Sequence, residues 1–332
     1  MNKSIKISII IPCYNVEKYI GDCLQSIYSQ DIDENDFEVI CVNDCSPDDT
    51  ENIVLEWQKK HKNLHLINHD VNKRQSAARN TGLRAAKGKY IWFIDGDDMI
   101  KENCLTSILK MMEDNNLDLL LFNPTEDKTR IYREEMPVSG IEYMENWLKT
   151  GKQSDTMYCI WARVARRELI LSNNLFFRED IIMAEDVSYS YKMCCYSQRV
   201  MATYDVFYLN RPVNISSVTR SALTADKLFS AVFLNPQELI EVADYAKKHS
   251  LFVADALKED AVFWLSRLKS LFSKMTVKQQ RKFIRLCKEK TNFINEITKK
   301  AGVNTKMIYN PNHLRIVMLT SFMKRTIKKI IR

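Results

Sequence analysis

Short apolar runs alternate with helical segments along the first third of the chain, and this alternation restricts the fold more than any other feature. Four β-rich runs each end in a polar turn: Ile5–Ile11, Phe37–Val42, Leu64–Ile67 and Tyr90–Ile94. Amphipathic stretches between them predict helices, one of them alanine-rich and ended by Gly88. Because such alternation builds a mainly parallel sheet with helices on both faces, we predict an α/β, Rossmann-like fold.

The alternation continues through one more helix and a strand that ends at Phe122, and then stops. Residues 123–140 are polar and predict irregular structure. From about Ala222 onward, apolar residues recur only at helical spacing. We therefore predict two domains: an α/β domain over 1–220 and a helical C-terminal region over 221–332.

The end of the chain is strongly basic. Residues 314–332 hold six lysines and arginines and no acidic residue, spaced among apolar side chains. This pattern fits an amphipathic helix that lies on an anionic membrane. It fits equally well a helix that packs on the α/β domain and exposes a solvated basic face.

The composition is that of an ordinary globular protein, with 45% hydrophobic residues, 27% charged residues and a net charge of +7. The nine cysteines lack CxxC spacing, which predicts free thiols in a reducing compartment. The N-terminal apolar run is too short for a signal peptide, and no stretch reaches the roughly 18 apolar residues that span a bilayer. We predict a cytoplasmic protein, at most peripheral at the inner face of the cell membrane, without a nucleic-acid partner.

Polar residues follow three of the predicted strands at the point where each strand ends. Tyr14, Asp44 and the loop Asp95–Asp98 fall there. After Asp44, Ser46 and Pro47 predict the N-cap and first position of the next helix. Ligands bind at the carboxyl ends of the strands in parallel sheets. The sequence therefore predicts that these polar clusters converge on one edge of the sheet.

Two acidic clusters are candidates for chemistry. The loop Asp95–Asp98, of sequence DGDD, suits a hard divalent cation that bridges two phosphates, and without a cation its three carboxylates would repel one another. The alternative is that Asp98 caps a helix that begins at Lys101. The second cluster, Glu185 and Asp186, opens a predicted helix. It either supplies a general base or only complements the helix dipole.

Five segments occur in a fixed order along the chain: SIIIPCYN, VNDCSPDDT, NKRQSAARNTG, FIDGDD and AEDVSYSYK. Together they resemble family 2 glycosyltransferases of the GT-A fold, over about Ile5 to Thr219. The resemblance implies an inverting, metal-dependent enzyme of bacterial surface-polysaccharide assembly. Such an enzyme transfers a sugar from a nucleotide-sugar donor to a glycan or a lipid-linked saccharide.

The resemblance also implies how the donor binds. Pro12 and Tyr14 would line the pocket for the base, and Asp44 would accept a hydrogen bond from the imide of uracil, which favours a UDP-sugar. Asn72 and Arg79 would contact the nucleoside and the donor sugar.

The acidic residues carry the reaction in this family pattern. Asp95 would face the ribose, and Asp97 would bind Mn²⁺ or Mg²⁺. Asp186 would be the catalytic base, and Glu185 would bind hydroxyl groups of the acceptor. Metal dependence and inversion of the anomeric carbon are thus expectations that come from the family.

Two further segments match the family less closely. Arg211 and Ser217 lie in a stretch that resembles the loop that closes over the diphosphate, although an ordinary basic surface loop has the same composition. Trp161 and Arg163 resemble a tryptophan-containing motif on the acceptor side. Because arginine and alanine replace the usual lysine and tyrosine, an acceptor role for Arg163 is left open.

The sequence departs from the family pattern near the base pocket. Asn43 replaces an aspartate and Cys45 replaces a glycine, so the tight turn after Asp44 must be made by a residue with a side chain. Arg74 stands where glycine is common, which either narrows the donor pocket or adds a contact to phosphate.

Two other functions fit parts of the pattern. A catalytically degenerate scaffold that binds a nucleotide sugar would not need Asp97 and Asp186. A sugar nucleotidyltransferase would need a glycine-rich, lysine-bearing loop after the first strand, and PCYNVEKY has no glycine. The donor sugar, the acceptor, the linkage and the oligomeric state cannot be deduced from these motifs.

Overall fold

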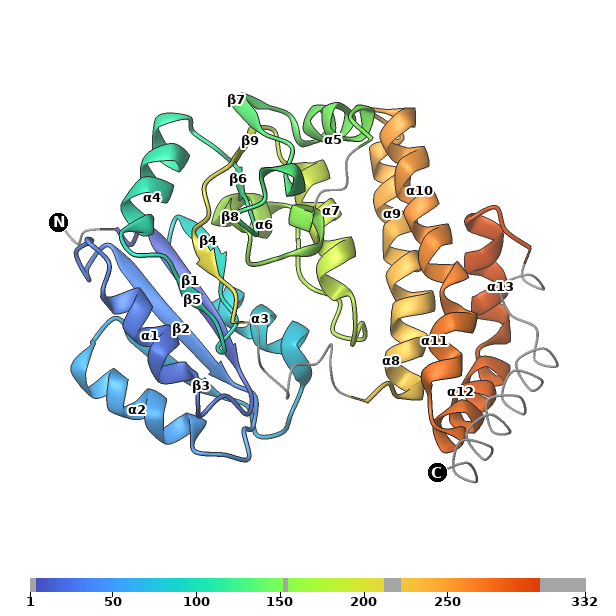
Figure 1. The fold of residues 1–332 in the computed structure, drawn as a ribbon, viewed down its shortest axis with the longest axis horizontal. Helices are drawn as coiled ribbons and strands as arrows, with labels where there is room; N and C mark the ends of the chain where they lie inside the picture. The colour runs from blue at the N-terminus through green and yellow to red at the C-terminus, as the bar shows by residue number, and fades with distance from the viewer. Residues whose placement is uncertain (1–3, 152–154, 212–221, 305–332) are drawn as a thin grey trace. The chain divides into compact units, whose positions relative to one another are not determined.

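The computed structural model describes residues 4–151, 155–211 and 222–304. They group into two compact units, one within Met1–Glu179 and Tyr189–Ser216, the other within Asp180–Ser188 and Ser217–Arg332 (Figure 1). The segment Asp180–Ser188, which holds the acidic pair Glu185 and Asp186, therefore groups with the helical unit. The predicted domain boundary near Arg220 lies outside the described residues.

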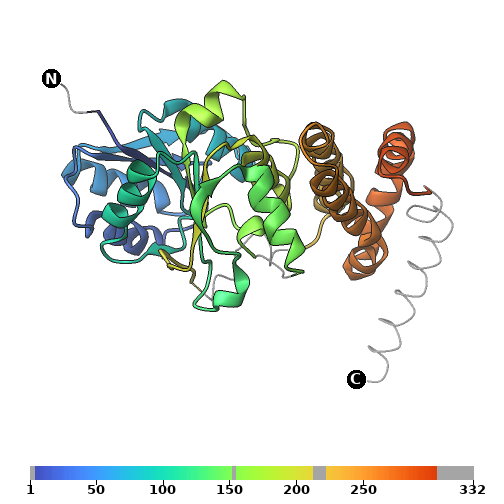
Figure 2. The same cartoon turned by 90° about the horizontal axis from the view of Figure 1, so that it is seen from above.

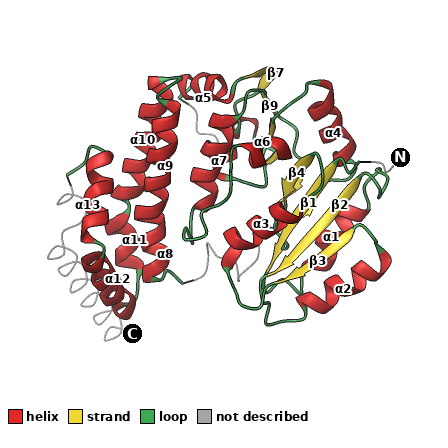
Figure 3. Cartoon of the chain, turned by 180° about the vertical axis from the view of Figure 1, so that it is seen from behind, coloured by secondary structure: helices red, strands yellow, loops and turns green. Residues whose placement is uncertain are grey.

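The first unit is built on an eight-stranded sheet with the strand order β3-β2-β1-β4-β8-β6-β9-β7. Its strands are β1 (Ile7–Cys13), β2 (Phe37–Asn43), β3 (Leu64–Asn68), β4 (Tyr90–Phe93), β6 (Leu119–Phe122), β7 (Glu134–Val138), β8 (Arg163–Arg166) and β9 (Val200–Thr203). Only β8 and β7 run antiparallel to the strands they pair with. The predicted mainly parallel sheet is confirmed, and Figure 3 shows β3, β2, β1 and β4 side by side.

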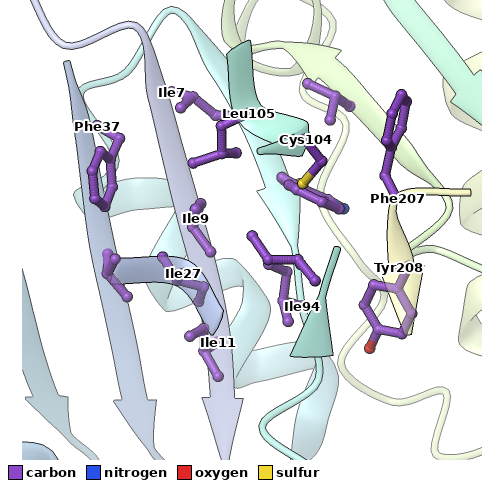
Figure 4. Packing of buried hydrophobic residues seen from close by; sticks show 14 of the residues in the cluster. Ile7, Ile9, Ile11, Ile27, Phe37, Ile94, Cys104, Leu105, Phe207 and Tyr208 are labelled. Carbon is purple, nitrogen blue, oxygen red and sulfur yellow. The ribbon is translucent and has the colours of Figure 1, made fainter. Parts of the chain in front are cut away.

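Helices cover both faces of this sheet. They are α1 (Ile20–Tyr28), α2 (Thr50–Lys60), α3 (Arg74–Ala85), α4 (Cys104–Asp114), α5 (Gly140–Lys149), α6 (Arg167–Ser172) and α7 (Glu185–Tyr196). Ile7, Ile9 and Ile11 of β1 pack in one buried cluster with side chains of α1, α2 and α4 (Figure 4). Ile10 points to the opposite face, where it meets Gly82 of α3. A Cβ atom at Gly82 would overlap the Ile10 side chain, so α3 can approach β1 this closely only at a glycine.

Two local predictions are wrong. Helix α2 begins at Thr50 instead of at Ser46 and Pro47, and Asp48 accepts hydrogen bonds from the Thr50 amide and hydroxyl. The Ser46 hydroxyl instead accepts from the Asn15 amide, which ties two loops together. The segment 123–140, predicted to be irregular, contains β7. This strand was not predicted because its partner strand β9 comes more than sixty residues later, so the local sequence shows no pairing pattern.

The second unit contains only helices among its described residues (Figure 2). They are α8 (Ala225–Phe229), a π-helical turn (Ser230–Leu234), α9 (Asn235–Ala246), α10 (Leu251–Ser266), α11 (Leu268–Lys274), α12 (Val277–Glu289) and α13 (Thr291–Lys300). This confirms the predicted helical character of the C-terminal region over its described residues, 222–304. None of the described helices is long and apolar enough to cross a bilayer. The basic segment 314–332 lies outside the described residues.

Candidate active site

The loops that follow β1, β2 and β4 lie together at the carboxyl edge of the sheet, as predicted. The amide of Asp44 donates to the carbonyl of Cys13 at 2.8 Å, and the amide of Ile94 donates to that of Ile10 at 3.0 Å. At this edge the Tyr14 side chain is 50% exposed. An exposed aromatic ring beside loops rich in carboxylates provides a surface on which a nucleotide base can stack.

Asp44 is buried and organises the start of α3. Its carboxylate accepts hydrogen bonds from the amides of Lys73 and Arg74, at 2.8 and 2.7 Å, and contacts Nδ1 of His69 at 2.7 Å. The Asn72 amide group, on an exposed residue, donates to the Asp44 carbonyl at 3.2 Å. The Asp44 carboxylate therefore holds the loop before α3 in place, and its contact with a base stays a prediction.

The two positions where the family usually has glycine adopt left-handed backbone conformations. The φ angle is 57° at Cys45 and 74° at Arg74. A side chain in this region costs roughly 1–2 kcal/mol relative to the right-handed region. The expectation that a residue with a side chain makes the turn after Asp44 is confirmed. Both strained residues are in direct contact with Asp44, because Cys45 follows it in the chain and the amide of Arg74 donates to its carboxylate.

Asp95 is held by two side chains from α3. Its Oδ1 atom accepts from Gln75 at 3.2 Å and from the Arg79 guanidinium at 3.1 Å. The Arg79 side chain is completely buried and its guanidinium lies over the ring of Phe177. Arg79 thus contacts Asp95 from the buried side of the loop. In this geometry the Arg79 side chain has no exposed surface with which to contact a donor sugar. Asp95 itself is partly exposed.

Asp98 anchors the chain at Arg211. The alternative, that Asp98 caps a helix that begins at Lys101, is wrong. The loop is followed by the short strand β5 (Met99–Ile100), which pairs with β10 (Tyr208–Leu209). The carboxylate of Asp98 accepts from the hydroxyl of Tyr208 at 2.7 Å and from the amide of Arg211 at 2.6 Å. Burial raises the pKa of Asp98 to about 7, although both hydrogen bonds act to lower it.

Tyr208 connects two carboxylate residues of the loop. Its hydroxyl donates to Asp98 and accepts from the backbone amide of Asp95 at 3.2 Å, while its ring stacks on Trp161 with centroids 4.2 Å apart. Burial raises the pKa of the Tyr208 hydroxyl well above its ordinary value, so it stays protonated and able to donate. The ring and hydroxyl together fix the backbone of the acidic loop.

Asp97 is the remaining acid of the loop and is partly exposed. No cluster of three or more histidine, cysteine, aspartate or glutamate side chains able to hold a metal occurs in the described parts of the chain. A cation here would therefore take one or two carboxylate oxygens from the protein and the rest from phosphate and water, which is the usual arrangement for Mg²⁺ on a diphosphate. The exposed, oxygen-only donor set fits such an ion.

Arg211 lies at the end of the described chain before 212. Its guanidinium pairs with Asp22 at 3.0 Å and lies over the ring of Tyr19. Asp22 is 62% exposed, so this ion pair is screened by solvent and can exchange for a stronger anion. Ser217, the other predicted diphosphate contact, lies outside the described residues, and Pro12 is half-buried at the end of β1.

Arg163 has a structural role, which answers the question left open by its motif. The side chain is buried and donates to the backbone carbonyls of Thr156, Cys159 and Ser190. A guanidinium so enclosed has no surface to offer an acceptor. Trp161 contributes through its stacking on Tyr208 and through its carbonyl, which accepts from the indole of Trp92 at 2.8 Å.

Glu185 and Asp186 form the first turn of α7, as predicted. Both side chains are partly exposed, and Ala184 immediately before them has a left-handed φ of 67°. Within the helical unit, the preceding backbone is fixed because the amides of residues 182 and 183 both donate to the hydroxyl of Ser230, at 3.0 and 3.1 Å. Two residues after Asp186, the hydroxyl of Ser188 donates to the buried Glu238 at 2.7 Å.

Several residues that position these acids within each unit were not predicted from the sequence. Gln75, His69 and Tyr208 contact Asp95, Asp44 and Asp98, and Ser230 anchors the segment before Glu185. Only His69 carried a usable signal, since it follows β3 at the same carboxyl edge. The others are ordinary polar residues in helices or short strands, and only their tertiary contacts distinguish them.

Comparison with known proteins agrees with this arrangement. Residues 8–170 match the sequence model of glycosyl transferase family 2. Over these residues, just under half of the chain, the sequence is similar to glycosyl transferase family 2. The glycosyltransferase EpsJ of Bacillus subtilis is 32% identical over 219 residues, which are 64% of this chain and 62% of EpsJ. The poly(ribitol-phosphate) β-N-acetylglucosaminyltransferase TarS of Staphylococcus aureus is 29% identical over 61% of this chain and 35% of its own length. These matches thus span less than two thirds of the length of either relative.

Solved structures share the fold. A crystal structure of TarS from S. aureus in complex with UDP-GlcNAc has a TM-score of 0.68 and 22% sequence identity, and covers 96% of this chain and 89% of that chain. The mannosyltransferase PcManGT from Pyrobaculum calidifontis, in complex with GDP-Man and Mn²⁺, has a TM-score of 0.55 at 16% identity, over 97% and 87% of the two chains. At these identities the likeness establishes the GT-A architecture of the fold.

Proposed function

We propose that this protein is an inverting glycosyltransferase that transfers a sugar from a UDP-sugar to a hydroxyl group of a glycan or lipid-linked saccharide. The observation that carries the proposal is the acidic loop at the end of β4. Two of its carboxylates, Asp95 and Asp97, are partly exposed, while the third, Asp98, is tied down to hold the loop in place. Such a loop suits the diphosphate of a donor bound at the carboxyl edge of a family 2 domain.

The preference for uracil rests on residues of the chain. TarS was solved with UDP-GlcNAc and PcManGT with GDP-Man, so the shared fold accommodates more than one base. The exposed ring of Tyr14, with Pro12, would stack on the base, and Asp44 and Asn72 lie at the loop that would surround the nucleoside. The imide of uracil donates a hydrogen bond. The Asp44 carboxylate would accept this bond through a lone pair that its present hydrogen-bond partners do not use.

A divalent cation, Mn²⁺ or Mg²⁺, would bind at Asp97 and supply charge neutralisation for the departing diphosphate. The chain contributes to the same end through Arg211. The guanidinium of Arg211 now pairs with the exposed Asp22, and a diphosphate would replace that carboxylate by offering more charge and more acceptor oxygens. Ser217 would add a hydroxyl donor. Arg79 and Gln75 would keep Asp95 oriented toward the ribose.

Asp186 is the proposed general base. It would take the proton from an acceptor hydroxyl as the oxygen attacks the anomeric carbon opposite the leaving diphosphate, and a single displacement of this kind inverts the configuration. Glu185 would hold neighbouring hydroxyl groups of the acceptor. The anchoring of residues 182 and 183 by Ser230, and of Ser188 by Glu238, fixes the backbone on both sides of this acidic pair.

The acceptor proposal comes from the relatives. TarS is named for transfer to poly(ribitol phosphate), and a B. spizizenii relative, 30% identical over 32% of its own length, is named a poly(ribitol-phosphate) β-glucosyltransferase. We propose that this chain likewise acts in bacterial surface-polysaccharide assembly, in the cytoplasm. Contact of 314–332 with the inner face of the membrane belongs to the same proposal, because a lipid-linked acceptor would be presented there.

The first experiment is a panel of UDP-, GDP- and dTDP-sugars, scored for hydrolysis or transfer with and without Mn²⁺. Asp97→Asn and Asp186→Asn are measured beside it. Asp255→Asn, which removes an exposed carboxylate of α10, is the matched control. We expect turnover of one UDP-sugar that needs the metal and falls by at least about a hundredfold in both site variants but not in the control.

The outcomes separate the proposed roles. Asp97→Asn should weaken binding of donor with metal, whereas Asp186→Asn should bind the donor normally and fail in transfer. If a nucleotide sugar binds but is never turned over with any acceptor, a binding scaffold replaces the enzyme. If a sugar phosphate and a nucleoside triphosphate are consumed instead, the chain is a nucleotidyltransferase. Retention of the donor's anomeric configuration in the product would refute the single displacement.

A further inference from the structure

The electrical charge of the chain is divided sharply along its length. Residues 267–332 hold eighteen lysines and arginines but only two glutamates, so they carry a net charge of +16. Since the whole chain carries +7, the first 266 residues carry −9. Asymmetry of this size indicates contact with an anionic partner through the basic part.

Within the described residues the positive charge is concentrated on one side of α12. Five cations of this helix are exposed: Lys278, Arg281, Lys282, Arg285 and Lys288. They recur at spacings of three and four residues, so they lie on one face, which we call the basic face of α12. The opposite face is buried and consists of Gln280, Phe283, Ile284 and Cys287. The helix is therefore packed on one side, and its other side carries these five cations and a single acid, the exposed Glu289 at the last residue of the helix.

This basic face is unfavourable for an isolated helix. Neighbouring cations at these spacings repel one another, and no acidic residue occupies the first turn, where it would complement the helix dipole. Of the five exposed cations of α12, only Lys282 forms an ion pair, with Asp226 at 2.5 Å. A merely solvated surface usually mixes both signs of charge, as α10 of the same unit does with Lys258 among Asp255, Glu259 and Asp260. An external anion would relieve this repulsion.

The shape of the basic face indicates what that anion is. From Lys278 to Lys288 the cations extend for roughly 15 Å along a straight helix, at 1.5 Å per residue. No exposed aromatic side chain stands among them to recognise a sugar, and the face offers only charge. The sequence continues with seven more cations and no acid over 305–332. Clusters of four to eight lysines and arginines of this kind bind anionic phospholipid headgroups.

We propose that the basic face of α12 docks on a bilayer that contains anionic phospholipids. None of its residues belongs to the segment 314–332 or to the proposed chemistry, so it can be tested while the proposed enzyme activity serves as an internal control. Attraction to the bilayer is screened by salt because the cations are exposed.

The test uses the full chain and flotation with vesicles of phosphatidylglycerol and phosphatidylcholine, at low salt and at 0.5 M salt. One variant replaces Lys278, Arg281, Arg285 and Lys288 by glutamine and leaves the ion pair of Lys282 intact. A matched control removes four exposed lysines elsewhere, Lys60, Lys62, Lys247 and Lys248. A third variant replaces Lys324, Arg325, Lys328 and Lys329. Thermal unfolding and turnover of soluble substrates verify that each variant is folded.

Each cation near an anionic surface changes the partition coefficient about fivefold. The partition coefficient of the α12 variant, which lacks four cations, should therefore fall about a hundredfold or more. The wild type should bind neutral vesicles weakly and be released at high salt, and the control should stay within a few-fold of wild type. The proposal is overturned if the α12 variant floats like wild type, if the control loses as much, or if neutral vesicles bind equally well. It is also overturned if only the tail variant loses binding. Binding of a soluble poly(ribitol phosphate) but of no vesicle would assign the face to a phosphate polymer instead.

Discussion

Replacing Tyr208 by phenylalanine tests how the acidic loop is held. The change removes a buried hydroxyl that donates to Asp98 at 2.7 Å and accepts from the amide of Asp95 at 3.2 Å, and it leaves the stacking on Trp161 in place. A hydrogen bond to a charged group contributes about 1.5–3 kcal/mol, and a buried amide left without a partner costs about 1–3 kcal/mol. Because Arg211 still donates to Asp98, we expect a loss of roughly 2–4 kcal/mol in the free energy of unfolding at pH 8.

The loss should depend on pH. The pKa of Asp98 is raised to about 7 in the folded protein, above its ordinary value near 4. The folded state therefore holds a proton that the unfolded state has released, and the stability contributed by Asp98 falls as pH rises from about 4 through about 7. Below pH 6 Asp98 is largely protonated, and the hydroxyl of Tyr208 stabilises a neutral group. The Asp95 amide loses its acceptor at either pH, but the lost bond to Asp98 is then a bond to a neutral group, so Tyr208→Phe should cost about 1–2 kcal/mol less than at pH 8.

The assay is thermal and urea unfolding at pH 5.5 and 8, with EDTA present to remove divalent ions. Tyr14→Phe, which removes a hydroxyl from an exposed ring, is the control and should change stability by less than about 0.5 kcal/mol. For a domain of this size, a loss of 2–4 kcal/mol corresponds to a fall in Tm of roughly 4–16 °C. If Tyr208→Phe unfolds like wild type at pH 8, or if it loses the same stability at both pH values, the hydroxyl of Tyr208 does not hold a charged Asp98 in place.

Three further changes have defined outcomes. Cys45→Gly should raise the free energy of unfolding by about 0.5–1 kcal/mol in urea, because relief of a left-handed residue outweighs the added chain entropy, whereas Cys45→Ala should not. Gly82→Ala should lower it by about 1–3 kcal/mol, because the added methyl group overlaps Ile10, and an unchanged midpoint would contradict that packing. Ser230→Ala should reduce kcat about tenfold with little change in the KM for donor, because the amides before Glu185 lose their acceptor. Ser273→Ala, which removes a partly exposed hydroxyl of α11 that donates to a carbonyl of its own helix, should leave kcat unchanged.

The parallel part of the fold could be predicted because its central strands β1, β2 and β4 are buried over nearly their whole length. β1, β2 and β4 are largely apolar runs, and the polar residues that follow each one mark the carboxyl edge. From this pattern alone the convergence of Tyr14, Asp44 and the DGDD loop was predictable. The left-handed turn at Cys45 was also predictable, because a residue with a side chain stands where the family has glycine.

The rest depended on contacts between residues far apart in the sequence. Asp98 and Tyr208 are 110 residues apart, and no periodicity links an aspartate in a loop to a tyrosine in a two-residue strand. The buried positions of Arg79 and Arg163 were equally hidden, because an arginine in a motif looks the same whether it faces a ligand or a backbone carbonyl. Strand β7 was missed because its pairing partner lies far along the chain.

The π-helical turn between α8 and α9 sets the direction, about the helix axis, in which the side chains of α9 point. A π turn accommodates one more residue than the same length of α-helix, and one residue rotates a helix by about 100°. Ser230 begins this turn and Glu238 lies beyond it, yet both hold the short segment that carries the acidic pair. Loss of a single residue here would swing Glu238 away from Ser188 while leaving the helix continuous. Natural or engineered length changes in this helix should therefore act like mutations at Glu185 and Asp186, even though they touch neither residue.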